Sequence, residues 1–423
     1  MRKVAFYTLG CRLNFAESSD LMRRFSESGC EVVPFEQAAD LYVINTCTVT
    51  AAAEKKCRQI IRSAHRLNPE AKIAVVGCFS ELRPQEVEQL PGVDFVLGNR
   101  NKHRLFEYMQ EGSVKTEDQA EAMPFVPSYS TLGRTRSFFK IQDGCNNFCS
   151  FCAIPFARGR SRSDTIERTM QTASEIARTG VKEIVLTGVN IGDFGRYQGE
   201  NFYGLLKQLE QLSGVERIRI GSVEPDLLGD DIIKLVAESR KLMPHFHIPL
   251  QAAHDDVLKK MKRHYGRSFY ADRVDTIRRL IPHAFIACDV IAGFPTETDT
   301  QFQEGLEFLE TLDLSALHVF SYSDREEAAA SKIPAVYGAG ELARRSAALH
   351  ALSDAKKQAF YARFSGTEAP VLWESDNEGG YMYGYTPNYL RVRRVFDENL
   401  VNTIVTTPLR ALEKDAGKDW CFA

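Results

Sequence analysis

The stretch DGCNNFCSFC at residues 143–152 is the strongest indication in the sequence of the fold and chemistry of this chain. Its cysteines, Cys145, Cys149 and Cys152, follow a C-x3-C-x2-C spacing directly after an apolar segment at residues 138–141. Three thiolates on one short loop suit three irons of a cubane cluster, and they leave the fourth iron free to bind a small ligand. A zinc site is the alternative, but zinc normally recruits a fourth Cys or His at similar spacing, and none follows closely.

The segments after this loop alternate between apolar runs and amphipathic stretches. The apolar runs lie at residues 138–141, 183–187, 217–222, 246–250, 284–291 and 316–320. Helical patterns separate them, so six strand–helix units follow one another. Such a series predicts a partial (β/α)6 barrel, in which the loops at the carboxyl ends of the strands form the active site.

Residues 1–110 show a similar alternation. The predicted strands cover residues 4–8, 41–44, 73–76 and 95–97. Helical patterns between them indicate a parallel-sheet α/β domain. Cys11, Cys47 and Cys78 each follow one of the first three strands. Because the carboxyl ends of parallel strands meet at one edge of a sheet, we expect these thiolates to converge there and to hold a second cluster. The alternative is three unrelated buried cysteines.

The composition of the chain limits the classes of protein to which it can belong. It has 423 residues, ten cysteines and a formal net charge of -3. This charge excludes a protein that binds nucleic acid through bulk positive charge, although local basic patches are compatible with it. No apolar run approaches the roughly 18–20 residues of a membrane span. The N-terminus lacks the core of a signal peptide, so we expect a cytoplasmic protein.

The last 58 residues, 366–423, change to short β-branched and aromatic segments with turns between them. This pattern predicts a small antiparallel β unit. A polar linker with several Pro, Gly and Ser residues covers 111–135. We therefore expect an α/β protein of three domains, at residues 1–112, 131–360 and 361–423.

Cys145, Cys149 and Cys152 match the signature of the radical S-adenosylmethionine (SAM) enzymes, and the chain resembles that superfamily. The resemblance implies that the open iron binds the methionine part of SAM, and that one electron cleaves SAM to a 5′-deoxyadenosyl radical. Two segments at predicted strand ends, LTGVN (186–190) and VIAGFP (290–295), resemble SAM-contacting segments. Glu224 lies at the end of another predicted strand, and its side chain is expected to face the barrel mouth. The expected SAM contacts are Gly188, Asn190, Glu224 and Gly293. Tight strand–helix turns and a solvated capping acid are the alternatives.

With the second cysteine set included, almost the whole chain is similar to the methylthiotransferases, a radical SAM family. The matching segments are Thr8–Asn14, Asn45–Val49, Gly92–Lys102, Asp143–Arg162, His247–Gln251 and, in the C-terminal domain, residues 384–389. This resemblance implies SAM, two 4Fe–4S clusters and a C-terminal RNA-binding TRAM-like β-barrel. It also implies that one SAM donates a methyl group to sulfur, while another supplies the radical.

The segments TLGCRLN (8–14) and ARGRSR (157–162) look most like the branch that modifies threonylcarbamoyladenosine at position 37 of tRNA. The expected product is the 2-methylthio derivative. Asp164 departs from the basic residue that this branch often has at that position. The alternative substrates are isopentenyladenosine 37 of tRNA and an aspartate of a ribosomal protein. A non-catalytic iron–sulfur RNA-binding protein is the alternative from another class.

Five arginines are predicted to contact RNA. Three of them follow the cysteine loop closely enough to meet a phosphate near the active site, and two alternate along one predicted strand face. The residues are Arg158, Arg160, Arg162, Arg391 and Arg393. The implied partners are tRNA and an electron donor such as flavodoxin or ferredoxin, with no membrane.

Overall fold

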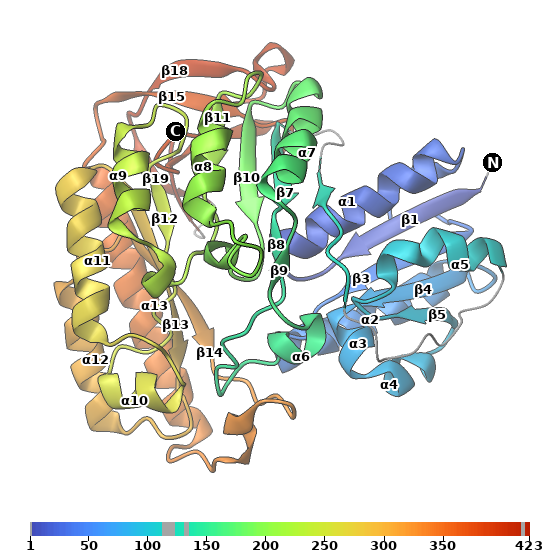
Figure 1. Ribbon diagram of the computed structural model, residues 1–423, viewed down its shortest axis with the longest axis horizontal. Helices are drawn as coiled ribbons and strands as arrows, with labels where there is room; N and C mark the ends of the chain where they lie inside the picture. Colours follow the sequence, from blue (N-terminus) through green and yellow to red (C-terminus); the bar gives the residue numbers. More distant parts are fainter. Residues whose placement is uncertain (1, 112–122, 131–134, 416–418) are drawn as a thin grey trace.

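The computed structural model describes residues 2–111, 123–130, 135–415 and 419–423. Three sheet systems follow one another along the chain (Figure 1), as the α/β expectation requires. The N-terminal domain lies beside the central barrel, and the C-terminal sheet lies across one end of that barrel. Within the described residues, no helix is long and apolar enough to cross a membrane.

The N-terminal domain is a parallel sheet of order β2-β1-β3-β4-β5 between two layers of helices. Its strands are β1 (Lys3–Thr8), β2 (Glu31–Val33), β3 (Leu41–Thr46), β4 (Lys72–Gly77) and β5 (Val93–Leu97). Its helices are α1 (Arg12–Glu27), α2 (Ala51–Leu67), α3 (Cys78–Leu82), α4 (Pro84–Glu88), η1 (Lys102–Arg104) and α5 (Leu105–Glu111). Every residue of β3 is buried, as expected for a central parallel strand covered on both faces.

The predicted partial (β/α)6 barrel is confirmed. Six parallel strands follow in the order β7-β10-β11-β12-β13-β14, and bridges at Ile218–Leu242 and Ser222–His247 join β11 to β12. The strands are β7 (Arg136–Lys140), β10 (Glu183–Thr187), β11 (Arg217–Arg219), β12 (His245–His247), β13 (Phe285–Ala292) and β14 (Ala316–Ser321). The main helices of this domain are α7 (Ile166–Arg178), α8 (Phe202–Glu210), α9 (Asp230–Glu238), α10 (Asp255–Lys260), α11 (Arg267–Leu280), α12 (Asp299–Thr311) and α13 (Ala339–Ala362).

The barrel domain also contains short helices and strands. They are β6 (Ser128–Tyr129), β8 (Gln142–Asp143), β9 (Arg162–Ser163), α6 (Ile154–Arg158), η2 (Ile191–Asp193), η3 (Pro225–Leu227) and η4 (Ala329–Lys332). Strand β6 pairs antiparallel with β7, the first parallel strand of the barrel, and β8 pairs with β9 around the cysteine loop. The β8–β9 pair therefore closes the base of that loop.

The N-terminal domain covers the side on which the barrel is open. On the β7 edge, Phe15 of α1 packs edge-on against Phe138, with ring centroids 5.8 Å apart. Beyond the β14 edge, Arg325 pairs with Glu54 of α2 at 2.7 Å and donates to the Thr48 carbonyl. These contacts with both barrel edges make the N-terminal domain the wall that completes the barrel.

The C-terminal domain is a six-stranded, mostly antiparallel sheet of order β18-β15-β16-β17-β20-β19, which confirms the predicted small β unit. Its elements are β15 (Glu368–Trp373), β16 (Tyr381–Tyr385), β17 (Arg391–Val395), η5 (Glu398–Leu400), β18 (Ile404–Pro408), β19 (Leu412–Asp415) and β20 (Asp419–Phe422). Its core includes Trp373 and Phe422, and it continues into Phe285 and Ala316 at the amino ends of β13 and β14. The domain therefore closes the amino end of the barrel.

A buried ion pair fastens the same end. Arg219 of β11 and Glu183 of β10 pair at 2.8 Å, and both side chains are fully buried. Arg219 also donates to the Pro387 carbonyl at 2.9 Å, which ties the barrel to the C-terminal domain. The neighbouring charges hold the pKa of Glu183 below its usual range, although burial alone would raise it.

Replacing Glu183 with Gln leaves the Arg219 charge buried without a carboxylate. We expect the free energy of unfolding to fall by about 3–5 kcal/mol, measured by thermal or denaturant unfolding of anaerobically purified protein. Asp272→Asn is the control, because Asp272 pairs with Arg273 and is 62% exposed. That change should cost less than about 1 kcal/mol. Equal losses in the two variants would contradict the assigned role of the buried pair.

Candidate active site between two cysteine clusters

The first cysteine loop runs from β8 to α6 and is anchored on both sides. The Cys145 amide donates to the Gly159 carbonyl at 3.1 Å, and the Ser150 amide donates to Met261 beyond α10 at 3.1 Å. Gly144 has φ +71°, and a Cβ there would lie 2.0 Å from the Arg160 carbonyl oxygen. The chain therefore needs glycine before the first cysteine, and the loop has one defined course.

The thiols of this loop fit a metal cluster. Burial, reinforced by the neighbouring thiols, raises the pKa of Cys145 and of Cys152 to about 12. Burial also raises the pKa of Cys149, although Arg263 donates to its Sγ at 3.1 Å and opposes this shift. These thiols stay protonated at neutral pH without metal, so iron binding must displace their protons. The loop offers three cysteines, and Arg263 beside it favours negative charge at Cys149.

The second set of cysteines lies at one sheet edge, as expected. Cys11 precedes α1, Cys47 follows β3 and Cys78 begins α3, and the strands before them are neighbours in the sheet. Gly10 has φ +94°, and a Cβ there would lie 2.8 Å from the Cys47 Cβ. Burial raises the pKa of Cys47 to about 12, and the thiols of Cys78 and Cys11 add to the rise.

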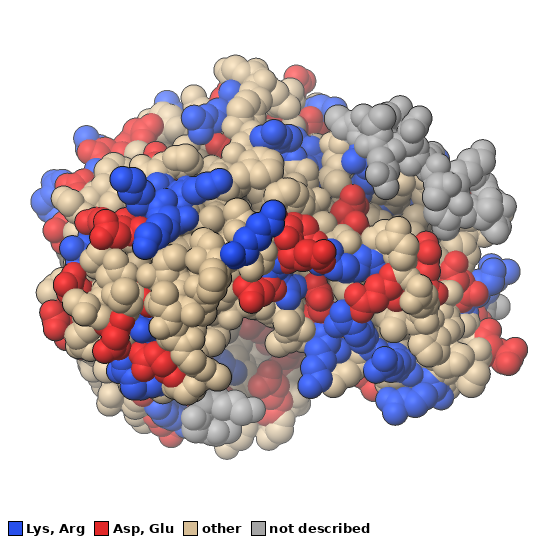
Figure 2. Space-filling view, turned by 90° about the horizontal axis from the view of Figure 1, so that it is seen from below, with Lys and Arg blue, Asp and Glu red and all other residues tan. Residues whose placement is uncertain are grey.

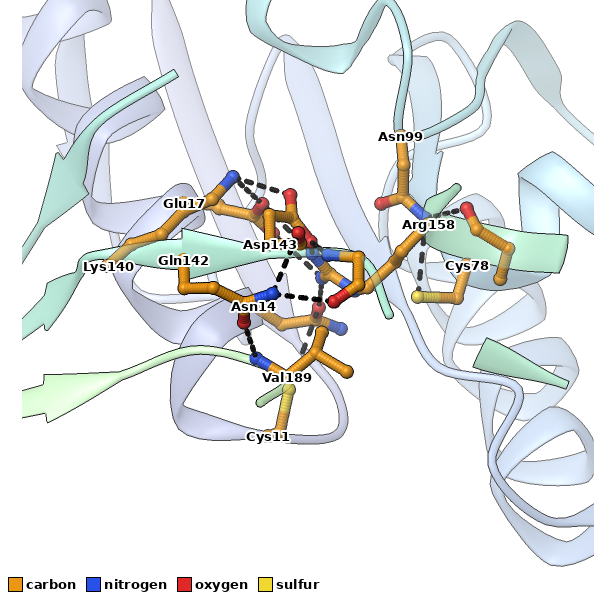
Figure 3. A network of polar contacts seen from close by, with 12 residues as sticks. Cys11, Asn14, Glu17, Cys78, Asn99, Lys140, Gln142, Asp143, Arg158 and Val189 are labelled. Atoms are coloured by element: carbon orange, nitrogen blue, oxygen red, sulfur yellow. Dashed lines mark hydrogen bonds and ion pairs between the residues drawn. The ribbon is translucent and has the colours of Figure 1, made fainter. Parts of the chain in front are cut away.

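A network of buried charges joins the two sets (Figure 3). Arg158 of α6 pairs with Glu17 of α1 at 3.0 Å and with Asp143 at 2.9 Å, and it donates to Asn14 Oδ1. Lys102 and Lys140 also pair with Glu17. Burial alone would raise the pKa of Glu17, but these three cations hold it well below its usual range.

The amide of Asn99 forms a second link in this network. Its Nδ2 lies 3.4 Å from the Cys78 Sγ and 2.7 Å from the Ala157 carbonyl oxygen, so one side chain contacts the second cysteine set and α6. Its Oδ1 accepts from Lys102 at 2.7 Å. The N-terminal domain and the first cysteine loop are thus held in one arrangement.

The structure corrects the predicted role of Arg158. Its side chain is 2% exposed, and its guanidinium is committed to Glu17 and Asp143, so it has no surface to offer a phosphate. Arg162 pairs with Asp143 at 3.0 Å and donates to backbone carbonyls. Arg160 remains exposed, with its Cζ 4.6 Å from the Phe148 ring centroid.

The two C-terminal arginines share a carboxylate. Arg391 and Arg393 pair with Asp415 at 3.2 and 2.9 Å, and Arg393 also pairs with Glu413. Their side chains project from one strand face as predicted, but Glu413 and Asp415 of β19 supply counter-charges. Figure 2 shows a comparable mixture on the face seen from below, where described Lys and Arg side chains stand among acidic ones.

Two of the predicted SAM contacts lie around a hydrogen-bonded turn. The amides of Val189 and Asn190 donate to Gln142 Oε1 at 3.0 and 2.8 Å, and a Cβ on Gly188 would lie 2.9 Å from the Gln142 carbonyl oxygen. Asn190 is 2% exposed, and neither polar atom of its side chain has a partner among the described residues. A buried amide without partners suits a polar ligand such as SAM.

The other two predicted contacts differ from each other. Glu224 pairs with Arg263, which also contacts the Cys149 sulfur, so this carboxyl lies beside the first cysteine loop. Gly293 has φ +75°, and a Cβ there would lie 2.6 Å from Leu342 of α13. Packing of the barrel against α13 accounts for this glycine, in keeping with a tight turn.

Two cavities lie beside these features. One, of about 210 Å³, is lined by Thr50, Cys152 and Asp289; the other, of about 520 Å³, is lined by Cys11 and His318. His247 and His318, which line the larger cavity, both hydrogen-bond to Asp289, at 2.6 and 3.2 Å. Asp289 lines the smaller cavity, so these hydrogen bonds connect the linings of the two cavities. Sequence reasoning missed it, although inward-facing alternation along β12, β13 and β14 could have signalled it.

Comparisons with known proteins identify the family. Residues 139–309 match the model of the radical SAM superfamily, and residues 3–98 match that of uncharacterized protein family UPF0004. The threonylcarbamoyladenosine tRNA methylthiotransferase MtaB of Bacillus subtilis is 37% identical, covering 96% of this chain and 93% of the relative. That of Aquifex aeolicus is 38% identical over 93% and 96%. A tRNA-2-methylthio-N(6)-dimethylallyladenosine synthase of Clostridium botulinum is 30% identical over 95% and 93%.

Among solved structures, the radical SAM methyltransferase TsrM of Kitasatospora setae, with cobalamin and a [4Fe-4S] cluster bound, has a TM-score of 0.54. It is 16% identical and covers 76% of this chain and 75% of its own, so it supports the fold alone. The sequence relatives extend from the N-terminal domain through the C-terminal sheet. By this match along nearly its whole length, the chain belongs to the threonylcarbamoyladenosine tRNA methylthiotransferase family of the radical SAM enzymes.

Proposed function

We propose that this protein converts N6-threonylcarbamoyladenosine at position 37 of tRNA to its 2-methylthio derivative. The observation that supports the proposal is that Arg158, Glu17 and Asn99 connect the two three-cysteine sites through ion pairs and hydrogen bonds. The chain that contains this arrangement belongs to this family. The dimethylallyladenosine branch is the second candidate, but two relatives named for it are 32% and 30% identical, against 33–38% for five relatives named for the first branch.

The protein uses SAM and 4Fe–4S clusters as its cofactors. When bound, they supply the radical and sulfur chemistry that an unactivated C–H bond requires. We assign one cluster to Cys145, Cys149 and Cys152, and the other to Cys11, Cys47 and Cys78. The chain itself places these two sites against each other, and the N-terminal domain covers the open side of the barrel, which limits the access of water to reactive species.

The polar groups around the first loop have complementary tasks in this proposal. The free amide of Asn190 hydrogen-bonds SAM, and Gly188 lets the turn that carries Asn190 pack closely against Gln142. Arg263 holds Glu224 and favours negative charge at Cys149. A small electron carrier such as flavodoxin or ferredoxin reduces the protein, and both partners meet in the cytoplasm.

The function is tested by mass spectrometry of tRNA nucleosides from cells with and without this gene. We expect 2-methylthio-N6-threonylcarbamoyladenosine to disappear in the deletion strain, while N6-threonylcarbamoyladenosine accumulates. Purified enzyme should restore the product on tRNA from that strain. Product on isopentenyladenosine alone would move the protein to the neighbouring branch. Modification of a ribosomal protein without any tRNA product would refute both readings.

The cluster assignment predicts iron content. Anaerobically reconstituted protein should hold about eight irons, from two four-iron clusters. Replacing Cys145, Cys149 and Cys152 with alanine should halve the iron and abolish SAM cleavage. Replacing Cys11, Cys47 and Cys78 should halve the iron and leave SAM cleavage partly intact.

Cys30→Ala is the matched control for these iron measurements, because Cys30 lies outside both sets and is only partly buried. It should retain all the iron. Full iron in the Cys11/Cys47/Cys78 variant would show that the second site is assigned wrongly. A non-catalytic iron–sulfur protein would keep its iron and cleave no SAM.

Electrostatic contact with tRNA predicts a salt-dependent contribution from Arg160. Each phosphate contact adds roughly 0.7–0.9 to the log–log slope of affinity against salt, because it releases condensed counterions. Arg160→Gln should reduce the slope by about that amount in filter binding. A joint change of Arg391 and Arg393 to Glu should also flatten it, but less per residue, because Asp415 already offsets part of their charge. An unchanged slope would argue against each contact.

A further inference from the structure

The larger cavity is built by all three domains. It has a volume of about 520 Å³, within the range of small-molecule sites. The N-terminal domain, the barrel and the C-terminal domain each contribute to its wall. Lining residues include Cys11, Arg12, Gly188, His318, Tyr389 and Arg391. A group held here touches a ligand residue of the second cysteine set at one side and the C-terminal domain at another.

Arg12 carries an exposed positive charge into this cavity. Its Nη2 lies 2.9 Å from the Tyr389 hydroxyl oxygen, and its Cζ lies 5.6 Å from the Phe138 ring centroid and 6.0 Å from that of Tyr389. No carboxylate in the described parts of the chain forms an ion pair with it. Aromatic rings thus orient the guanidinium without neutralising it.

The other cations around Tyr389 are paired. Arg136 lies 2.7 Å from Glu374, and Arg219 lies 2.8 Å from Glu183. Burial would raise the pKa of the Tyr389 phenol, but the charges of Arg12, Arg136 and Arg219 outweigh burial and lower it. Of these three guanidiniums, Arg12 alone has no carboxylate partner among the described residues, so its charge is available to an anionic ligand.

The other two Lys and Arg side chains of the described cavity wall differ from Arg12 in the same way. Lys357 pairs with Asp419, and Arg391 pairs with Asp415. An anion entering the cavity would compete with these carboxylates at either position, whereas at Arg12 it meets only a phenol and two ring faces. The geometry therefore selects Arg12 as the anion-binding group.

We propose that Arg12 binds the threonine carboxylate of the modified adenosine and so selects this substrate over isopentenyladenosine. This inference rests on the proposed function. The threonylcarbamoyl group ends in a carboxylate, whereas an isopentenyl group has no charge. The planar fork of arginine matches a carboxylate with two parallel hydrogen bonds. Since Arg12 directly follows Cys11, recognition of the N6 substituent is coupled in position to the second cysteine set.

The test pairs a protein change with a substrate change. Anticodon stem-loop RNA is prepared with threonylcarbamoyladenosine or with its threonine methyl ester, which lacks the charge. For the wild-type enzyme, esterification should lower kcat/KM about ten- to hundredfold, the usual effect of losing a charged hydrogen-bonded pair. Arg12→Gln should show a similar loss on the acid and almost no further loss on the ester.

Two further variants serve as controls. Lys357→Gln removes a paired charge from the same cavity and should keep the wild-type sensitivity to esterification. Arg12→Lys keeps the charge without the fork and should retain part of that sensitivity. Iron content and Tm of Arg12→Gln should match the wild type. If this variant fails to fold, the role of Arg12 is still tested by Arg12→Lys and by the ratio of wild-type kcat/KM on the acid to that on the ester.

The outcomes separate two failures. Equal sensitivity to esterification in Arg12→Gln and the wild type would overturn the role of Arg12, as would a wild-type enzyme indifferent to the ester. Absence of methylthio product on the acid substrate with wild-type enzyme would instead overturn the proposed function. A loss of sensitivity confined to the Arg12 variants supports the inference.

Discussion

The arrangement of the active site depends on one buried set of charges, in which Arg158 lies between Glu17 and Asp143 (Figure 3). Burying charges is costly unless each is paired, so these groups are stable only when the N-terminal domain and the cysteine loop are docked. Four cations, including Lys102 and Lys140, meet two carboxylates. The excess positive charge acts on the thiols nearby: Arg158 opposes the effect of burial, which raises the pKa of Cys11. Arg158 at this joint therefore lessens the cost of an anionic sulfur at Cys11, although the pKa of that thiol stays raised.

The contact between the N-terminal domain and the barrel explains why a barrel of only six strands is sufficient to build the active site. Six strands leave an opening, and the N-terminal domain fills it through Phe15 on one edge and Glu54 on the other. The C-terminal sheet closes the amino end, where Arg219 donates to the Pro387 carbonyl. Each domain supplies a wall that the other two lack. A cavity enclosed in this way can exclude water and still admit a nucleoside between domains, which a complete barrel with a packed interior would not.

Sequence reasoning succeeded where the signal was local. The spacing of Cys145 to Cys152 is read directly, and Cys11, Cys47 and Cys78 follow strands whose parallel order places them together. It failed where the answer depends on distant partners. Arg158 resembles a surface arginine until Glu17, far away in sequence, buries it. Arg391 and Arg393 do alternate on a strand, but Asp415 comes from another strand. Strand β2 was not predicted, because a strand of three residues is too short to show a recognisable hydrophobic pattern.

The same contrast between paired and unpaired charge distinguishes structural from functional arginines in this molecule. Arg158, Arg219 and Arg263 have carboxylates, and each fastens one element to another. Arg12 is held by a phenol and aromatic faces, which fix its direction and leave its charge uncompensated. Preorganisation of this kind is efficient for recognition, because the ligand supplies the missing anion without displacing one already bound. Since a misplacement of about 1 Å can cost a hundredfold in rate, the rigid neighbours of Arg12 contribute to the chemistry by holding the substrate in register with both cysteine sites.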